Sequence, residues 1–167
     1  MKTLFTWLSL LFLWLTSLPV STFALDDQLL ARAHTYAYDH QITSVQSLNR
    51  FRPELSVTRE QASKMIVWFA RDYLGDEYFF RADKTLDCDF VDKTFVSKDL
   101  RSHVIESCRF GIFRGDQRTF NPKGTLTVWQ ARIVLWRITG KVVATGDMIT
   151  WSITRWELIV LMYQARE

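Results

Sequence analysis

The clearest pattern of apolar and polar positions lies in residues 120–140, FNPKGTLTVWQARIVLWRITG. Its first five residues are typical of a turn, because proline fixes φ and glycine accepts positive φ. Thr127 precedes Gln130 by three positions, which is the spacing of a capping box at a helix N-terminus. Apolar residues then follow on most of the helix circumference until Gly140. The pattern predicts a capped helix that is buried on several sides. The apolar positions are Trp129, Ile133, Val134, Leu135, Trp136 and Ile138.

The same pattern occurs twice more. An offset of 69 positions places residues 51–69, FRPELSVTREQASKMIVWF, on it. The identical pairs are Phe51 with Phe120, Pro53 with Pro122, Thr58 with Thr127, Gln61 with Gln130, and Ala62 with Ala131. An offset of 27 in the other direction aligns Thr154, Trp156 and Glu157 with Thr127, Trp129 and Gln130. A single capping-box spacing is common by chance, but three at aligned positions before apolar runs indicate an internal repeat.

Residues 1–24 have the pattern of a signal peptide. Lys2 is the only charge, the run from Leu4 to Leu18 is apolar, and Thr22 and Ala24 occupy the −3 and −1 positions of a small-residue cleavage site. The alternative is an uncleaved N-terminal anchor, although the run is short for a membrane span of about 20 residues. Cleavage would leave residues 25–167, a length that suits one small domain.

The repeat divides the remaining chain into modules. Module one is residues 25–75, a polar connector covers 76–87, module two is 88–140, and a partial module three is 141–167. Module one begins with a helical pattern over residues 26–38. In module two, a predicted first helix has one apolar face formed by Leu100, Val104, Ile105 and Cys108. Module three has only ten residues, 141–150, before the short segment that leads into its capped helix, which leaves no room for a first helix.

Cys88 and Cys108 are the only two cysteines. In an exported chain an even number of cysteines favours a disulfide, which would tie the start of module two to its first helix. The alternative is two buried free thiols.

Charge and motifs exclude several functions. Without Lys2 the chain has 20 basic and 18 acidic residues, a balance that gives no reason to expect nucleic acid as a partner. There is no HExxH, GxSxG, phosphate-binding loop or GxGxxG, so we expect neither an enzyme nor a cofactor. Asp87, Asp89 and Asp92 lack the glycine and the terminal glutamate of a calcium-binding loop, so a solvated turn without metal is expected.

The motifs of module two, in their order, resemble an S-layer homology (SLH) module. The family's signature is F-x-D, a helix, G-I-x-x-G, F-x-P, then [IL]-T-R-A-E and a second helix. Module one matches from Phe51 onward, and module three matches only in residues 153–157. The matching residues of module two are Phe90, Asp92, Gly111, Ile112, Gly115, Phe120, Pro122, Leu126 and Thr127.

The resemblance implies a mostly α fold, in which three helix-loop-helix repeats form a pseudo-threefold prism, here with an incomplete third repeat. It also implies noncovalent attachment of an exported surface protein to cell-wall polysaccharide, often pyruvylated, in grooves between modules. The T-R-A-E arginine of the family nominates Arg59 and Arg155, since arginine at a helix N-terminus suits an anionic ligand. The remaining ligand-binding candidates are Gly111, Gly115, Arg114, Lys123 and Trp129.

Departures from the signature weaken the resemblance. Val128 replaces one of the three arginines, and module one lacks the Gly-x-x-x-Gly. Module three lacks a first helix and the F-x-P turn. At least one groove is therefore expected to be inactive. Two other interpretations remain: a structural or protein-docking surface module without glycan binding, and an enzyme of an unrecognised kind. Both signature arginines are expected to lie outside the core.

Overall fold

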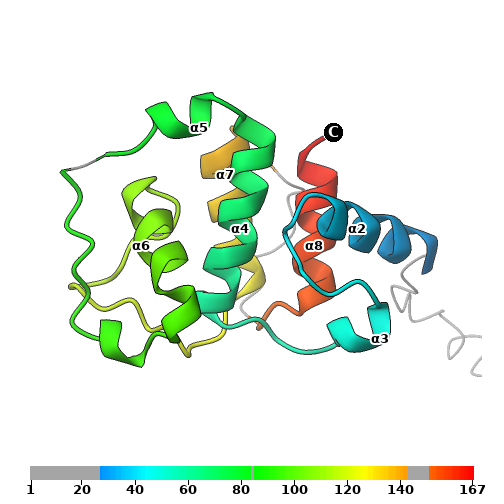
Figure 1. Cartoon of the computed structure of the whole chain (residues 1–167), viewed down its shortest axis with the longest axis horizontal. Coiled ribbons are helices and arrows are strands. Elements are labelled where there is room, and N and C mark those ends of the chain that lie inside the picture. Colours follow the sequence, from blue (N-terminus) through cyan, green and yellow to red (C-terminus); the bar gives the residue numbers. More distant parts are fainter. Residues whose placement is uncertain (1–26, 84, 143–150) are drawn as a thin grey trace, which may run out of the picture.

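A computed structural model describes residues 27–83, 85–142 and 151–167. Within these ranges the protein is mostly helical and has isolated β-bridges but no strand, which confirms the predicted α class (Figure 1). No helix in these ranges is long and apolar enough to cross a membrane. The predicted signal peptide, 1–24, lies outside the described residues. The elements are α2 (Asp27–Asp39), α3 (Leu48–Phe51), α4 (Arg59–Leu74), α5 (Glu77–Phe80), η1 (Lys93–Phe95), η2 (Lys98–Leu100), α6 (Arg101–Arg109), α7 (Val128–Thr139) and α8 (Arg155–Ala165).

All three predicted capping boxes are present, at the start of α4, α7 and α8. In each box the threonine hydroxyl accepts from the backbone N–H three residues later, and the side chain of that third residue accepts from the threonine N–H. Two otherwise unpaired backbone donors are thereby satisfied at each helix start. The three capped helices therefore begin where the sequence predicts.

The segments before the caps form a closed ring of backbone hydrogen bonds. The Val57 N–H donates to Ile153 O at 3.0 Å, the Ile153 N–H to Leu126 O at 2.8 Å, and the Leu126 N–H to Val57 O at 2.9 Å. These three residues occupy equivalent positions in the repeat, and each is fully buried. The ring brings three distant parts of the sequence together and fixes the starts of the three capped helices beside one another.

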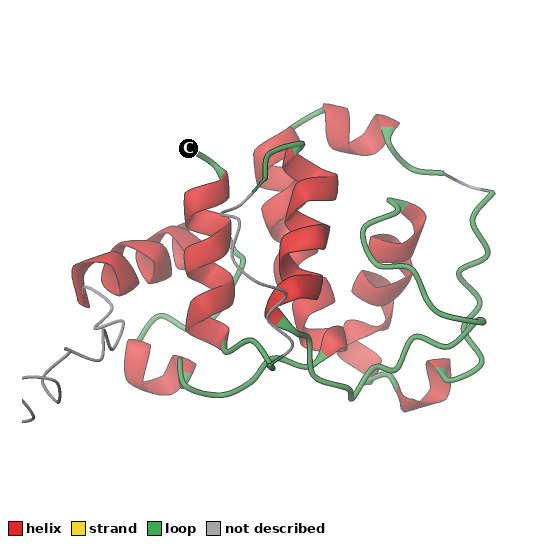
Figure 2. Cartoon of the chain, turned by 180° about the vertical axis from the view of Figure 1, so that it is seen from behind, coloured by secondary structure: helices red, strands yellow, loops and turns green. Residues whose placement is uncertain are grey.

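Helices pack around this ring in a regular order. The first helix of module two, α6, packs on α4, and the first helix of module one, α2, packs on α8 (Figure 1). Helix α7 packs against both α4 and α8, and Figure 2 shows the same arrangement from behind. One hydrophobic core runs through all three modules.

The predicted disulfide is present. Cys88 and Cys108 are bonded, with their Cα atoms 5.9 Å apart, and no free cysteine remains among the described residues. The bond ties the segment that precedes η1 to the last turn of α6. The prediction of a bridge within module two is therefore confirmed.

Two predicted apolar patterns are buried only in part. Helix α7 is not covered on all of its apolar sides, because Trp129 and Trp136 are 40% and 53% exposed. Ile105 is 40% exposed, whereas Leu100, Val104 and Cys108 of the same predicted face are buried. The predicted polar connector, residues 76–87, also contains a short helix, α5, whose Tyr78 is 1% exposed.

Candidate functional site

Arg155, the first residue of α8, is held in place by the turn of module one. Its backbone N–H donates to Leu55 O at 2.9 Å, and its Nη1 donates to Phe51 O at 2.8 Å. The capping box at Thr154 fixes the helix start immediately before it. The position of the guanidinium group is therefore set by both module three and module one.

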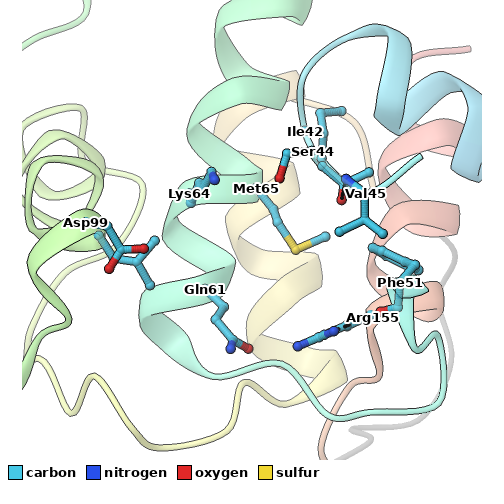
Figure 3. A pocket seen from close by; sticks show the side chains of 11 residues that line it. Ile42, Ser44, Val45, Phe51, Gln61, Lys64, Met65, Asp99 and Arg155 are labelled. Atoms are coloured by element: carbon cyan, nitrogen blue, oxygen red, sulfur yellow. Dashed lines mark hydrogen bonds between the residues drawn. The ribbon is translucent and has the colours of Figure 1, made fainter. Parts of the chain in front are cut away.

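A pocket of about 250 Å³ opens beside this guanidinium group. Its wall combines the loop after α2, the first half of α4, η2 and the start of α8. Figure 3 shows the Arg155 side chain extending toward Gln61 beneath Met65. The lining residues are Ile42, Thr43, Ser44, Val45, Phe51, Gln61, Lys64, Met65, Asp99, Leu100 and Arg155.

The pocket lining suits a ligand with both an anionic and an apolar part. Arg155 and Lys64 supply two cations, and Asp99 supplies the one carboxylate among the lining residues. The Ser44 hydroxyl and the Gln61 amide NH2 group are available to a polar ligand, while Gln61 Oε1 accepts from the Thr58 N–H in the capping box. The N-terminus of α8 adds part of a helix-dipole charge, although its first N–H groups already donate to Leu55 O, Pro53 O and the Thr154 hydroxyl, and Glu157 lies in the same turn.

Arg59, the counterpart of Arg155 in module one, lies in a more closed setting. Its Nε donates to Phe120 O at 2.7 Å, and its guanidinium carbon lies 4.9 Å from the Phe120 ring centroid and 5.4 Å from that of Phe113. Burial lowers the pKa of Arg59, and the nearby Asp92 carboxylate opposes this shift. The expectation that Arg59 lies outside the core is wrong, because its side chain packs on two buried aromatic rings.

The two arginines make equivalent contacts across module boundaries. Arg59 donates to the carbonyl of Phe120, and Arg155 donates to the carbonyl of Phe51, the aligned residue. A third contact of this kind would need an arginine at Val128 and a Phe-x-Pro turn in module three. The sequence lacks both.

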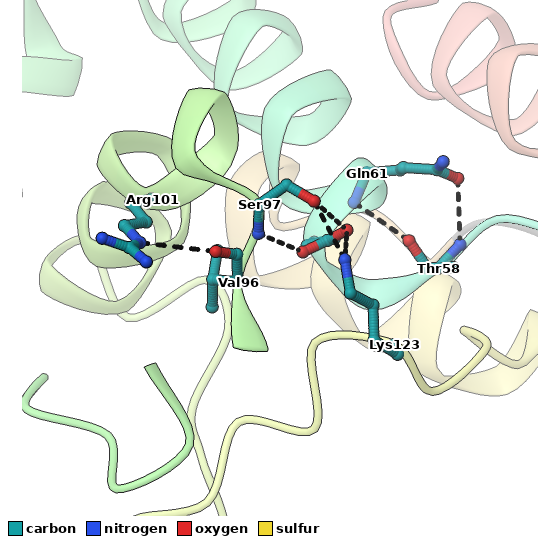
Figure 4. Close-up of polar contacts among 7 residues, drawn as sticks. Thr58, Gln61, Val96, Ser97, Arg101 and Lys123 are labelled. Carbon is teal, nitrogen blue, oxygen red and sulfur yellow. Dashed lines mark hydrogen bonds and ion pairs between the residues drawn. The ribbon is translucent and has the colours of Figure 1, made fainter. Parts of the chain in front are cut away.

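Lys123 is engaged in an internal ion pair (Figure 4). Its Nζ lies 2.6 Å from Oε1 of Glu60, a residue only 4% exposed, and Ser97 donates to both Glu60 oxygens at 2.9 Å. Burial alone would raise the pKa of Glu60, but the bonds from Lys123 and Ser97 outweigh it and lower the pKa. The cluster ties α4 to two segments of module two, and Lys123 does not line the Arg155 pocket.

The glycine candidates are explained by local packing. A Cβ on Gly115 would lie 2.6 Å from Cε1 of Phe90 and 2.9 Å from Thr119 O, so no side chain fits there. Gly111 follows the C-cap of α6 and has φ +67°, a conformation that favours glycine. Arg114 is exposed beside Gly111. None of these three residues lines the Arg155 pocket.

The seven candidates are therefore separated in space. Arg155 lines the pocket, Arg59 and Lys123 bind neighbouring residues of module two, and Trp129 lies exposed on α7. Sequence reasoning missed Lys64 and Asp99 as pocket residues. Lys64 lies three positions after Gln61 on the same helix side, which is a usable signal, whereas Asp99 comes from another module and has none.

Comparisons with known proteins give no relative. No family model, curated protein or solved structure matches the chain. Within the described ranges no group of His, Cys, Asp and Glu side chains is arranged to hold a metal ion.

Proposed function

We propose that this chain is an exported, diverged SLH-type surface module that attaches noncovalently to an anionic cell-wall polysaccharide at the Arg155 pocket. The observation that carries the proposal is the position of Arg155, at a helix N-terminus and in the wall of a pocket shared with Lys64. A guanidinium group can donate paired hydrogen bonds to a carboxylate, and the helix dipole adds attraction. Apolar atoms of Phe51 and Met65 suit the methyl group of a pyruvylated sugar.

The proposal includes a three-repeat prism with an incomplete third repeat. The closed ring of Val57, Leu126 and Ile153 supports it, because each residue donates to a different neighbour in cyclic order. The isolated bridges follow the same order: Ser56 with Thr154, Thr125 with Thr58, and Ser152 with Thr127. Equivalent contacts at three equivalent positions are what a pseudo-threefold arrangement requires.

The same contacts support a proposal with a single working groove. Arg59 is packed against Phe113 and Phe120, and Lys123 is bound to Glu60, so the boundary between modules one and two is occupied by protein groups. The boundary between modules two and three has Val128 in place of an arginine. The Arg155 pocket is the remaining groove with a cation at a capped helix start.

Co-sedimentation with purified sacculi of the source organism tests the proposal. Arg155→Ala should weaken binding by at least tenfold, as expected for a lost charge-assisted pair. Arg155→Lys should weaken it less, because the charge remains while the planar fork is lost. Arg109→Ala, an exposed arginine on α6, is the matched control and should bind as the parent does. Thermal unfolding of each variant separates lost binding from lost folding, and unchanged sedimentation of a folded Arg155→Ala variant would reject the proposal.

A further inference from the structure

Helix α7 is the capped helix on which no module-first helix packs in the described part of the chain. Helix α6 covers α4, and α2 covers α8, so each covering helix is the first helix of the next module in cyclic order. By the same order, the first helix of module three would cover α7. The sequence offers only ten residues, 141–150, for that helix and its connections.

The uncovered side of α7 has an apolar stripe. Trp129, Ile133 and Trp136 follow the i, i+4, i+7 spacing that places side chains on one helix face. Trp129 and Trp136 are 40% and 53% exposed, and Trp151, whose carbonyl accepts from the Val128 N–H, is 63% exposed. Large exposed aromatic groups close together are typical of an interaction surface.

At the positions equivalent to Trp129 and Trp136, residues of the other two capped helices are buried or partly buried, whereas Lys64, the α4 counterpart of Ile133, lines the Arg155 pocket. The counterparts of Trp136 are Val67, which is fully buried, and Tyr163, whose ring centroid lies 5.8 Å from that of Tyr36 on α2. One counterpart of Trp129 is Glu60, which is 4% exposed and bound by Ser97. The repeat therefore identifies this face as one that a helix normally covers.

The surroundings of the stripe are basic. Helix α7 contains Arg132 and Arg137 and no acidic residue. The Nε of Arg132 is buried and has no hydrogen-bond partner, and the pKa of Arg137 is lowered by burial and by the nearby Arg114. Between α4 and α6, by comparison, an arginine is paired with a carboxylate of the covering helix. Arg71 Nη2 donates to Oε1 of Glu106 at 2.6 Å.

We infer that the Trp129–Ile133–Trp136 stripe of α7 binds an acidic amphipathic helix of a partner protein, in the place that the cyclic order assigns to a first helix of module three. The partner helix would present small side chains to the tryptophans, as α2 buries Ala33 and Ala37 where it packs on α8. A carboxylate at its edge would pair with the partly exposed Arg132 side chain. This inference concerns a surface separate from the Arg155 pocket.

A peptide of α2 serves as the probe, because α2 covers the equivalent face of α8. Two labelled peptides span residues 27–41, one native and one carrying Arg32→Glu at a position that is exposed in the protein. Fluorescence anisotropy against the protein without residues 1–24 should show saturable binding of the acidic peptide, tighter by about tenfold than the native one and weaker at high salt.

Variants of the protein locate the binding. Trp129→Ala, Trp136→Ala and Arg132→Gln should each weaken acidic-peptide binding by at least about tenfold, as expected for interface anchors. Phe80→Ala is the matched control, since Phe80 is 87% exposed on α5, and should leave binding unchanged. Hydrogen exchange should show new protection of α7 amides when the peptide is bound. Each of the four variants should bind sacculi as the parent protein does.

Three results would overturn the inference. The first is no saturable binding of the acidic peptide below about 1 mM. The second is binding that survives Trp136→Ala, which would place the peptide elsewhere, for example on α8 in exchange for α2. The third is concentration-dependent self-association that Trp136→Ala abolishes, which would assign the face to a second copy of this chain.

Discussion

Arg59 and Arg155 occupy the same position after a capping threonine but have different surroundings. Arg155 lines an open pocket, whereas Arg59 lies against two aromatic rings. The sequence predicts the shared position, because the capping box fixes each helix start. It does not predict the difference, since Phe113 and Phe120 reach Arg59 from a module that begins far along the chain.

Arg59→Ala should therefore lower the free energy of unfolding. The change removes the bond to Phe120 O and two cation–π contacts, and a loss of about 1–3 kcal/mol is expected. Urea unfolding measures it. Arg109→Ala is the control and should stay within about 0.5 kcal/mol of the parent protein. Equal stability of the two variants would show that the Arg59 contacts contribute little.

His34 should make stability depend on pH. The residue is 5% exposed on α2, its Nε2 has no hydrogen-bond partner, and burial lowers its pKa, opposed by a backbone bond to Val45. Because the unfolded imidazole binds protons more readily, the free energy of unfolding should be constant above its unfolded pKa, about 6.5, and fall below it. Burial also lowers the pKa of His103, so both histidines act in the same direction.

The test compares thermal midpoints between pH 7.5 and pH 5 for the parent and His34→Leu. As the pH falls over this range, the parent should lose stability more steeply than the variant, because only the parent has a buried imidazole at position 34 that can be protonated. Equal slopes would mean that protonated His34 is tolerated within the fold.

At the scale of elements, short-range signals were sufficient for the helix starts. The three capping boxes and the disulfide depend on spacings of a few residues or on a single possible pairing, and all are present. The exposed face of α7 could not be predicted, because apolar residues surround this helix and only a neighbouring helix decides which of them is buried. Helix α5 was missed because its buried Tyr78 lies in a charged segment.

Substitutions in α7 should separate its covered side from its exposed side. Leu135 is fully buried, so Leu135→Ala should cost about 2–5 kcal/mol through a core cavity. Thr127→Ala should cost about 1 kcal/mol through the lost cap. Trp136→Ala should cost less than Leu135→Ala in spite of the larger side chain, because Trp136 is half exposed. The reverse order in denaturant unfolding would contradict this description of the helix.

At the scale of the whole molecule, the disulfide constrains a region that has little regular structure before α6. Cys88 and Cys108 are 20 positions apart, and closing a loop of this length is expected to contribute about 3 kcal/mol. The Cys88→Ser, Cys108→Ser double variant should therefore unfold at a lower temperature than the oxidised parent. Addition of reductant should lower the thermal midpoint of the parent but not that of the variant. Equal midpoints for the oxidised parent and the variant would show that the bridge is dispensable for folding.

The proposed function depends on one groove of the molecule. The boundary of modules three and one holds the pocket, the capped helix start and two cations, while the other two boundaries are either filled by protein groups or lack the arginine. Binding to wall polysaccharide should therefore involve a single surface, and the exposed stripe of α7 should take no part in it.

The most direct measurement is an NMR titration of the protein without residues 1–24 with polysaccharide released from the sacculi. The backbone amides of Ser44, Gln61, Lys64 and Arg155 should shift in a saturable way, and the shifts should diminish with the same polymer after mild acid removal of its ketal groups. Arg155→Ala should abolish them. Saturable shifts confined to other surfaces, or no shifts with a polymer that retains its acidic groups, would contradict glycan binding at this pocket.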